Sequence, residues 1–295
     1  MASAQLRDTR RRIRSVEAIK KITRAMELIA TSRIPKAQAR VNASKPYTAK
    51  LIEVIQNVSA AGAGSSHRLL ERRDIETVGL VIVSSDRGLA GSYASNVIRL
   101  AEARIREIDR EGKDVTLYTI GKKAQAYFRY RGFRIENAYL GVTDTPGYGD
   151  ARAVANSVLM AYATERVDSV EVFFTQYRSA MNQFPTRLDL LPITPPERDE
   201  EAEVAQVAYG YEPSPEEILD RLLPRYVEAI IFNVLLEASA SEHSARRRAM
   251  KAATDNAEDL IKVLSVQANR ARQAEITTAI SEIVGGAEAL AEGRR

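Results

Sequence analysis

The sequence predicts an α/β protein in which long N- and C-terminal helices form an antiparallel coiled coil and carry a small, inserted, Rossmann-like α/β domain. In residues 1–58 and 214–290, apolar residues recur at steps of three, four and seven over far more than the length of an ordinary globular helix. Residues 75–195 instead alternate short β-branched runs with helical patterns. We therefore expect an N-terminal shaft helix, an α/β domain, and a C-terminal shaft helix packed on the first.

The N-terminal helix is predicted from a single stripe of apolar side chains. Pro35 is expected to cause at most a local kink, and the helical pattern continues to about Val58. We expect the stripe to face the C-terminal helix. Its members are Leu6, Ile13, Val16, Ile19, Ile22, Met26 and Ile29.

The α/β domain follows a small-residue linker at 60–66. Strands are predicted at 77–85, 114–120, 134–140, 169–176 and 186–191, and helices at 92–111, 122–131 and 150–166. Asp150 is the expected N-cap of the last of these helices. The order of the elements indicates a mainly parallel sheet. The acidic, proline-containing stretch that follows is expected to be a return loop.

Pro215 is well placed to start the C-terminal helix. Up to about Met250 this helix should pair with the N-terminal helix. The expected seam alternates steps of three and four through positions 253, 257, 260, 264, 267, 271, 274 and 278. Past Asn269 the helix should lack a partner within the chain, and its slim apolar tip predicts that something outside the chain surrounds it.

Charge is distributed unevenly along the chain. Residues 1–50 hold thirteen Lys and Arg against three acidic residues, whereas 197–217 holds eight acidic residues and one Arg. The basic N-terminal face therefore predicts an anionic partner. An Arg-rich start is also a feature of organellar transit peptides, but the helical pattern continues beyond the ~30 residues that such peptides occupy.

Several classes of site are excluded or disfavoured by composition. The chain has no cysteine, and its two histidines are too few and too isolated for a histidine metal site. The longest apolar run is far shorter than the ~18 residues of a membrane span. We therefore expect a soluble protein, or one that reaches a membrane through partners.

Residues 88–91 form a glycine-containing turn between a strand and a helix, where doubly wound domains bind phosphate. The turn lacks both GxGxxG and GxxxxGK[ST], so a structural turn is favoured. Ser84, Ser85 and Asp86 have no neighbouring histidine for a nucleophilic triad. Asp144 and Asp150 are expected in surface turns.

The arginine runs 10–12 and 246–248 fit a solvated helix face, a phosphate contact or an acidic-protein contact. A coiled-coil nucleic-acid-binding protein is one alternative, although Tyr47 is the only aromatic residue of the basic first fifty. A nucleotide-dependent enzyme that uses residues 75–195 is another.

Five segments resemble the gamma subunit of the rotary ATP synthase. Residues 20–27 (KKITRAME) are similar to the family's KITKAME, 84–91 (SSDRGLAG) to TSDRGLCG, and 250–257 (MKAATDNA) to MKAATDNA. Residues 269–274 (NRARQA) are similar to NKARQA, and 276–287 to ITxExxEIxxGA. Two positions depart from these patterns: Ala90 replaces a common Cys, and Ala279 replaces a Glu, which removes one potential ion pair near the tip.

The resemblance implies a rotor shaft without catalytic residues, cofactor or metal. It implies contact with a hexamer of alpha and beta subunits around the C-terminal helix, with an epsilon subunit and with a c-subunit ring. No nucleic acid would be bound, and attachment to the cytoplasmic side of the cell membrane would be indirect, through the c ring. The implied hexamer contacts are Lys20, Lys21, Arg24, Met26, Arg87, Arg272, Gln273, Ile276, Ile280, Ile283 and Val284. The implied contacts to the epsilon subunit and c ring are Tyr209, Tyr211 and Glu212.

Overall fold

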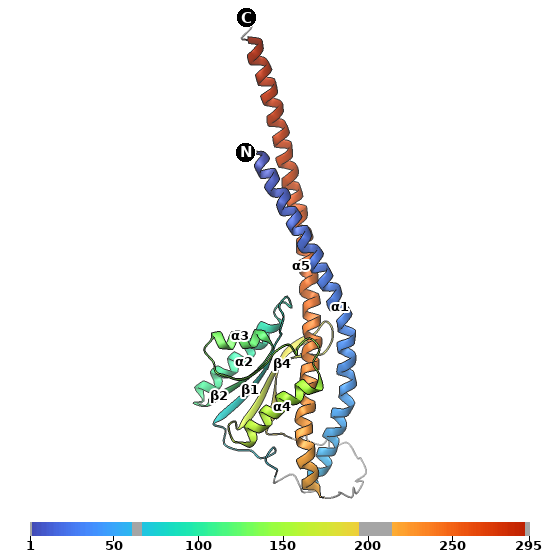
Figure 1. Cartoon of the computed structure of the whole chain (residues 1–295), viewed down its shortest axis with the longest axis vertical. Coiled ribbons are helices and arrows are strands. Elements are labelled where there is room, and N and C mark those ends of the chain that lie inside the picture. The colour runs from blue at the N-terminus through green and yellow to red at the C-terminus, as the bar shows by residue number, and fades with distance from the viewer. Residues whose placement is uncertain (1, 61–66, 195–213, 293–295) are drawn as a thin grey trace. The chain divides into compact units, whose positions relative to one another are not determined.

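A computed structural model of the chain describes residues 2–60, 67–194 and 214–292 (Figure 1). Its residues form two compact units. One comprises residues 30–246, and the other comprises residues 1–29 together with 247–295. The long helices α1 (Ala2–Ala60) and α5 (Pro215–Glu292) each contribute to both units.

Both long helices run through prolines without ending. Pro35 and Pro46 lie inside α1, and Pro224 lies inside α5. An interior proline removes one backbone hydrogen bond and costs about 3 kcal/mol. Packing offsets this cost, since residues close to these prolines, such as Ile34 and Leu223, are fully or nearly fully buried. The predicted continuation past Pro35 and the predicted start of α5 at Pro215 are confirmed.

The α/β domain contains a five-stranded sheet with the strand order β3-β2-β1-β4-β5. Strands β1 (Thr77–Val83), β2 (Asp114–Ile120), β3 (Ile135–Tyr139) and β4 (Ser169–Tyr177) are parallel. Strand β5 (Gln183–Leu191) is antiparallel to β4 and starts three residues before the predicted position. Pro185 pairs with Thr175 at the edge of the sheet, where a missing backbone donor is tolerated. The predicted fold class is confirmed.

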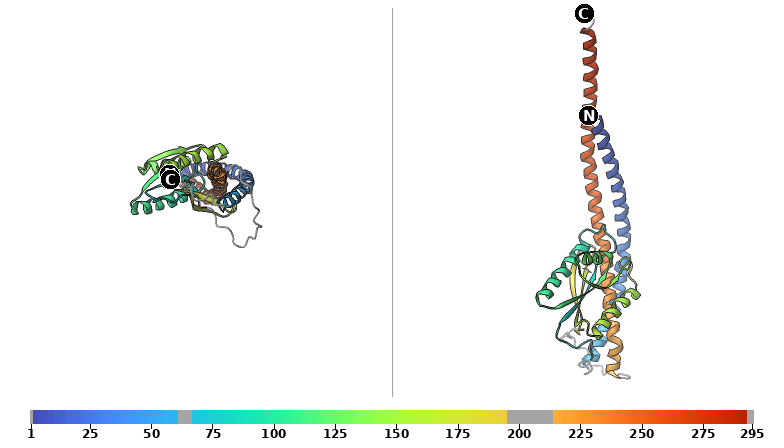
Figure 2. Two further views of the ribbon diagram at one scale, coloured as in Figure 1. Left: turned by 90° about the horizontal axis from the view of Figure 1, so that it is seen from below. Right: turned by 60° about the vertical axis from the view of Figure 1, so that its left-hand side comes forward.

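Each face of the sheet has its own cover (Figure 1 and Figure 2). Helices α2 (Tyr93–Arg110) and α3 (Lys122–Tyr130) pack on one face through a cluster that includes Leu80, Val97 and Phe128. The opposite face packs on α4 (Tyr148–Ala163) and, within this unit, on both long helices. The domain therefore shares one core with the helix pair, because α1 and α5 supply side chains to the same cluster as β1 and α4.

The N-cap of α4 corrects a sequence prediction. The helix begins after Gly147, and Asp150 is its third residue, where its carboxylate accepts the Gly147 N–H at 2.7 Å. Glycine has no side chain to cap the helix, so the carboxylate of Asp150 satisfies the backbone from inside the first turn. The prediction that Asp150 is the N-cap was therefore wrong, because Gly147 holds that position.

The buried seam of α1 alternates steps of three and four along its length. In the unit of residues 30–246, this seam packs on α5: Leu51 and Ile55 share a cluster with Leu219 and Leu223. Asn233 Nδ2 donates to Thr48 Oγ1 at 2.7 Å. The predicted pairing of the first part of α5 with the N-terminal helix is therefore confirmed for this unit.

Candidate functional site

The unit formed by residues 1–29 and 247–295 is a helix pair with a narrow interior. Thr23 Oγ1 and Thr254 Oγ1 lie 2.8 Å apart and are buried. Ala257, Leu264 and Ala268 are the other buried positions that follow on α5. Small side chains at such positions let two helices approach closely, so little apolar volume lies between them.

The seam of α5 in this unit differs from the predicted one. Positions 253, 257, 264 and 271 are at least partly buried, as expected. Positions 260, 267, 274 and 278 are exposed, and the other members of the observed seam lie at 254, 261, 268 and 275. Leu260 was placed inside and is 46% exposed. Heptad spacing fixes the period of the seam but not its phase, and the helix turns Thr254 and Ala268 inward.

The outside of this helix pair carries apolar side chains that the sequence analysis did not expect there. Ile19, Ile22 and Ile29 were assigned to the inward stripe of the N-terminal helix, but the inward positions are Thr23 and Ala30. Exposed apolar groups in a row mark surfaces that bind partners. The exposed set is Ile19, Ile22, Leu28, Ile29, Leu260, Val263 and Val266, each between 46% and 60% exposed.

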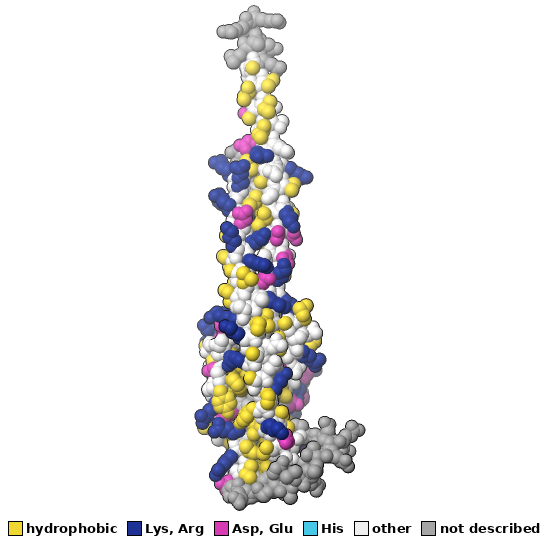
Figure 3. Space-filling view, turned by 90° about the vertical axis from the view of Figure 1, so that its right-hand side faces the viewer, with side chains coloured by type: hydrophobic (Ala, Val, Ile, Leu, Met, Phe, Trp, Pro, Cys, Tyr) yellow, Lys and Arg dark blue, Asp and Glu magenta, His cyan; other side chains and the backbone are white. Residues whose placement is uncertain are grey.

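Near the end of α5, four predicted contact residues share one helix face. Ile276, Ile280, Ile283 and Val284 are spaced by four, three and one, and between 51% and 72% of each is exposed. Figure 3 shows apolar side chains along this part of α5 and Lys and Arg side chains over the adjoining stretch of the unit. A β-carbon added at Gly285 or Gly286 would meet nothing within 4 Å. The face is therefore slim, apolar and uncovered by the described chain.

The predicted polar contact residues of this unit are mostly exposed. Lys20 forms an ion pair with Glu258 at 3.4 Å, and Arg24 forms one with Glu27 at 2.9 Å. Lys21, Arg272 and Gln273 are exposed, and Met26 is half-buried. Exposed pairs of this kind contribute about 0 to 1 kcal/mol, so they can exchange partners easily. The other predicted set, Tyr209, Tyr211 and Glu212, lies outside the described residues.

In the unit of residues 30–246, Asp86 holds the glycine-containing turn together. Its carboxylate accepts hydrogen bonds from the Thr143 N–H at 3.2 Å, the Thr143 hydroxyl at 3.1 Å and the Lys122 N–H at 3.2 Å. Leu89 and Gly91 have positive φ. A β-carbon at Gly121 would come within 2.9 Å of the Ser85 backbone, so the backbone at Gly121 packs directly against the backbone at Ser85. These contacts support the prediction of a structural turn.

Helix α5 occupies the place where a doubly wound domain would bind a ligand. That place is the crevice beyond the carboxyl ends of the strands, at the switch between β1 and β4. The Tyr93 hydroxyl donates to Ala238 O at 3.1 Å, and the Ser241 hydroxyl donates to Thr175 O at 3.0 Å. Arg246 donates to Glu242 at 2.5 Å and to Gly88 O at 3.4 Å. Side chains of α5 thus fill the position of a nucleotide.

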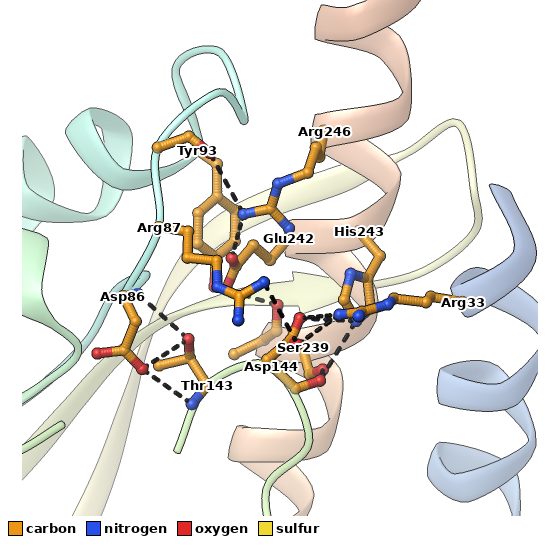
Figure 4. Close-up of polar contacts among 12 residues, drawn as sticks. Arg33, Asp86, Arg87, Tyr93, Thr143, Asp144, Ser239, Glu242, His243 and Arg246 are labelled. Carbon is orange, nitrogen blue, oxygen red and sulfur yellow. Dashed lines mark hydrogen bonds and ion pairs between the residues drawn. The ribbon is translucent and has the colours of Figure 1, made fainter. Parts of the chain in front are cut away.

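Asp144 joins α5, α1 and the turn after β1, and we call the set of Arg33, Arg87, Asp144, Ser239 and His243 the Asp144 cluster (Figure 4). Its carboxylate is hydrogen-bonded by Arg33 and lies 4.0 Å from the Arg87 guanidinium. Its carbonyl accepts the Ser239 hydroxyl at 3.0 Å and lies 3.3 Å from His243 Nε2. Asp144 lies in a turn, as expected, but its side chain is only 25% exposed and is engaged by other elements, so it is not an ordinary surface position.

Burial and charge shift three pKa values in this region. Burial tends to raise the pKa of Asp144, but the Arg33 hydrogen bond and charge, with His243 and Arg87, hold it below its usual value. Burial raises the pKa of Glu242 despite the adjacent Arg246. Burial also lowers the pKa of His243, against the pull of Asp144. His243 is therefore neutral near pH 7, and Asp144 is ionised.

Sequence reasoning missed this cluster, although a signal for it exists. Residues 239–244 read SASEHS, a mostly polar run in the middle of a helix. In the structure, none of these six residues is more than 4% exposed. A polar run has no reason to be buried in a two-helix seam. Such a run therefore indicates a third element beside the helix pair, and the structure shows that the α/β domain accepts the hydrogen bonds of Ser239 and Ser241.

The described residues offer neither a metal site nor an open nucleotide site. None of them form a group of three or more His, Asp or Glu suited to a metal ion. Asp86 is engaged by backbone and hydroxyl donors, and the strand-end crevice is filled by α5. Within the part of the chain that the structure describes, no helix combines the length and apolar character needed to cross a bilayer. One unit is a helix pair with an uncovered apolar and basic surface, and in the other unit a small α/β domain packs on both long helices. These features define a stalk-type subunit of a larger assembly.

Comparison with known proteins agrees with that class. The family model described as ATP synthase matches residues 5–290. The chain is 49% identical over 296 residues to the ATP synthase gamma chain of Frankia casuarinae, with 99% of both chains covered. It is 44% identical over 303 residues to that of Mycolicibacterium smegmatis, covering 98% of this chain and 99% of the relative. The chain belongs to the ATP synthase gamma-chain family.

Solved structures show the same fold at low sequence identity. A chain of the Euglena gracilis mitochondrial ATP synthase matches with a TM-score of 0.69 and 16% identity, covering 99% of this chain and 97% of that one. A chain from the central stalk and c ring of the Tetrahymena thermophila enzyme matches with a TM-score of 0.59 and 20% identity, covering 79% and 99%. The helix pair with its inserted domain is therefore an arrangement found in rotary ATP synthases.

Proposed function

We propose that this chain is the central rotor shaft of an ATP synthase. It couples ion flow through a membrane c ring to ATP synthesis or hydrolysis in an alpha/beta hexamer by rotating inside that hexamer. The chain performs no chemistry, and it is held at the cytoplasmic side of the cell membrane by its partners. The observation that carries the proposal is the exposed apolar face of Ile276, Ile280, Ile283 and Val284.

The apolar face fits a turning contact. An apolar sleeve interacts with such a face through non-directional burial, so no angle is strongly preferred. Charged groups at the same place would be desolvated differently at each angle. The exposed cations Lys20, Lys21 and Arg24 suit acidic loops of the surrounding subunits, because exposed ion pairs are weak enough to break as the shaft turns.

The remaining predicted contacts fit the same arrangement. Arg272 and Gln273, exposed on α5 ahead of the apolar face, are proposed to hydrogen-bond loops of a beta subunit. Arg87, whose side chain is 70% exposed, is proposed to face the rim of the hexamer. Tyr209, Tyr211 and Glu212 are proposed to contact the epsilon subunit and the c ring.

Reconstitution tests the proposal directly. The purified chain alone should hydrolyse no ATP, and mixing it with alpha and beta subunits should yield a hydrolysing complex that contains it. A hydrolysing complex that excludes the chain under conditions where all three are folded would count against the proposal.

Nucleic-acid binding is the second candidate, supported by the excess of Lys and Arg in the first fifty residues. It predicts retention on duplex DNA at about 150 mM salt, with an affinity that falls steeply as salt rises. Retention that disappears below this salt concentration, together with assembly into the hexamer, would eliminate it.

A further inference from the structure

The Asp144 cluster connects three elements through one loop residue. Asp144 lies between β3 and α4. Its carboxylate accepts a hydrogen bond from Arg33 of α1, and its carbonyl accepts one from Ser239 and lies near His243, both of α5. Ser239 and His243 are four residues apart, so both lie on the same face of α5. All of these contacts fall within the compact unit of residues 30–246.

We propose that Asp144 is a positioning residue that locks the α/β domain to both shaft helices and sets how efficiently torque passes between them. This proposal rests on the proposed shaft function and adds to it the residue that prevents slippage. Arg33 and Ser239 are the matching groups on the two helices.

Hydrogen bonds such as those from Tyr93 to Ala238 O and from Ser241 to Thr175 O also tie the domain to α5, and an apolar cluster ties it to both long helices. Leu51, Val154 and Leu219 belong to one apolar cluster that joins α1, α4 and α5. Apolar contact is strong in total but non-directional. Hydrogen bonds to an ionised group are directional and short-ranged. A carboxylate bound by α1, on a loop whose carbonyl is bound by α5, therefore fixes the register of all three parts.

The surroundings of Asp144 are suited to this role. The carboxylate is only 25% exposed, so its contact with Arg33 is shielded from competing solvent more than an ordinary surface pair. Thr143, the preceding residue, is bound to Asp86 through its N–H and its hydroxyl. The loop is thus anchored to the sheet on one side and to the helices on the other.

The test compares two activities of complexes carrying Asp144→Asn. In the soluble complex with alpha and beta subunits, ATP hydrolysis should stay within about twofold of wild type, because Asp144 is not itself among the residues proposed to contact the hexamer and its neighbour Arg87 is left unchanged. In the complete enzyme in sealed vesicles, the number of ions pumped per ATP hydrolysed should fall several-fold. Arg33→Met, which removes the partner on α1, should give the same separation, and Asp144→Glu should recover part of the pumping.

Asp189→Asn is the matched control, since it removes a carboxylate of the same domain whose ion-pair partner among the described residues is Arg187 of its own strand. It should leave both activities unchanged. An unchanged pumping ratio in both Asp144→Asn and Arg33→Met would overturn the proposal, as would parallel loss of pumping and soluble hydrolysis, which indicates a general structural role. Failure of the wild-type chain to form a hydrolysing complex would instead defeat the proposed shaft function.

Discussion

Two stretches of α5 differ in which side chains they bury. In residues 237–246, polar and charged side chains such as Ser241, Glu242 and His243 are buried. In residues 260–284, apolar side chains such as Val263 and Ile283 are exposed. In the first stretch, Ser239 and Ser241 donate to the α/β domain, and Glu242 pairs with Arg246 of the same helix. The second stretch finds no partner inside the described chain, so its partner belongs to another molecule. Burial along this helix is decided by what lies beside it, not by side-chain polarity.

The largest effect is expected from changing the exposed apolar stretch of α5. Placing carboxylates on the apolar face, as Ile280→Asp with Ile283→Asp, should lower ATP hydrolysis by the assembled complex at least tenfold, because burying unpaired charges costs several kcal/mol. Melting of the isolated chain should not change. Thr278→Asp, on the opposite side of α5, is the control and should cost less. Full activity of the double variant would show that the apolar face is not enclosed.

The next largest effect is expected from changing the buried polar stretch of α5. Arg246→Met leaves the carboxylate of Glu242, which is 2% exposed, without its ion-pair partner. Removing one member of a buried pair costs about 3 kcal/mol or more. Urea unfolding of the isolated chain should report this loss. Arg270→Met, at an exposed position of the same helix, should have almost no effect, and equal stability of the two variants would contradict the assignment.

A smaller effect concerns the narrow seam between the two stretches. Thr254→Val removes the hydroxyl partner of Thr23 and should cost about 1 to 2 kcal/mol. Combining it with Thr23→Val should cost less than the sum of the single variants, because the hydrogen bond between the two hydroxyls is lost only once. Strictly additive costs, measured by chemical denaturation, would argue against the hydrogen bond.

Bulk at the slim end of α5 should slow turning more than assembly. Tryptophan at Gly285 and Gly286 meets no atoms of the chain within 4 Å of the added β-carbons, so the isolated chain should fold normally. Turnover of the assembled complex should fall several-fold while its yield on gel filtration stays close to wild type. Normal turnover would show that this end is not tightly surrounded.

The smallest expected effect is a pH dependence from His243. Its pKa in the folded chain is lowered from 6.5 by burial, against Asp144 and with the charges of Arg246 and Arg33. The unfolded chain therefore binds the proton more readily, and the free energy of unfolding falls as pH drops below about 6.5. His243→Gln should show a shallower loss between pH 7.5 and 5.5. The loss should not vanish, because burial lowers the pKa of His67 too.

The sequence predicted those features that depend on local pattern. The bounds of β1, β2 and α2 follow from β-branched runs and turn residues, and the passage of α1 through Pro35 follows from the unbroken apolar period. The inward side of each helix was harder to predict, because Ile22 and Leu260 are as apolar as core residues yet serve an outer surface. Hydrophobicity alone does not distinguish a face buried within the chain from a face covered by a partner.

The Asp144 cluster could not be predicted for a different reason. Arg33, Asp144 and Ser239 are far apart in sequence, and each alone fits a solvated position. Only the packing of the α/β domain on both long helices brings them together. The proposed contacts Arg272, Gln273 and Arg87 followed from the resemblance to gamma subunits and remain predictions, because they concern surfaces of other chains.

Direct observation of rotation is the measurement that tests the shaft function most closely. The chain has no cysteine, so Tyr130→Cys, at a position 89% exposed on α3, gives a unique labelling site. A probe attached there should turn in one direction when ATP is supplied to a complex immobilised through its alpha or beta subunits. A probe that stays fixed while the same complexes hydrolyse ATP would contradict the account.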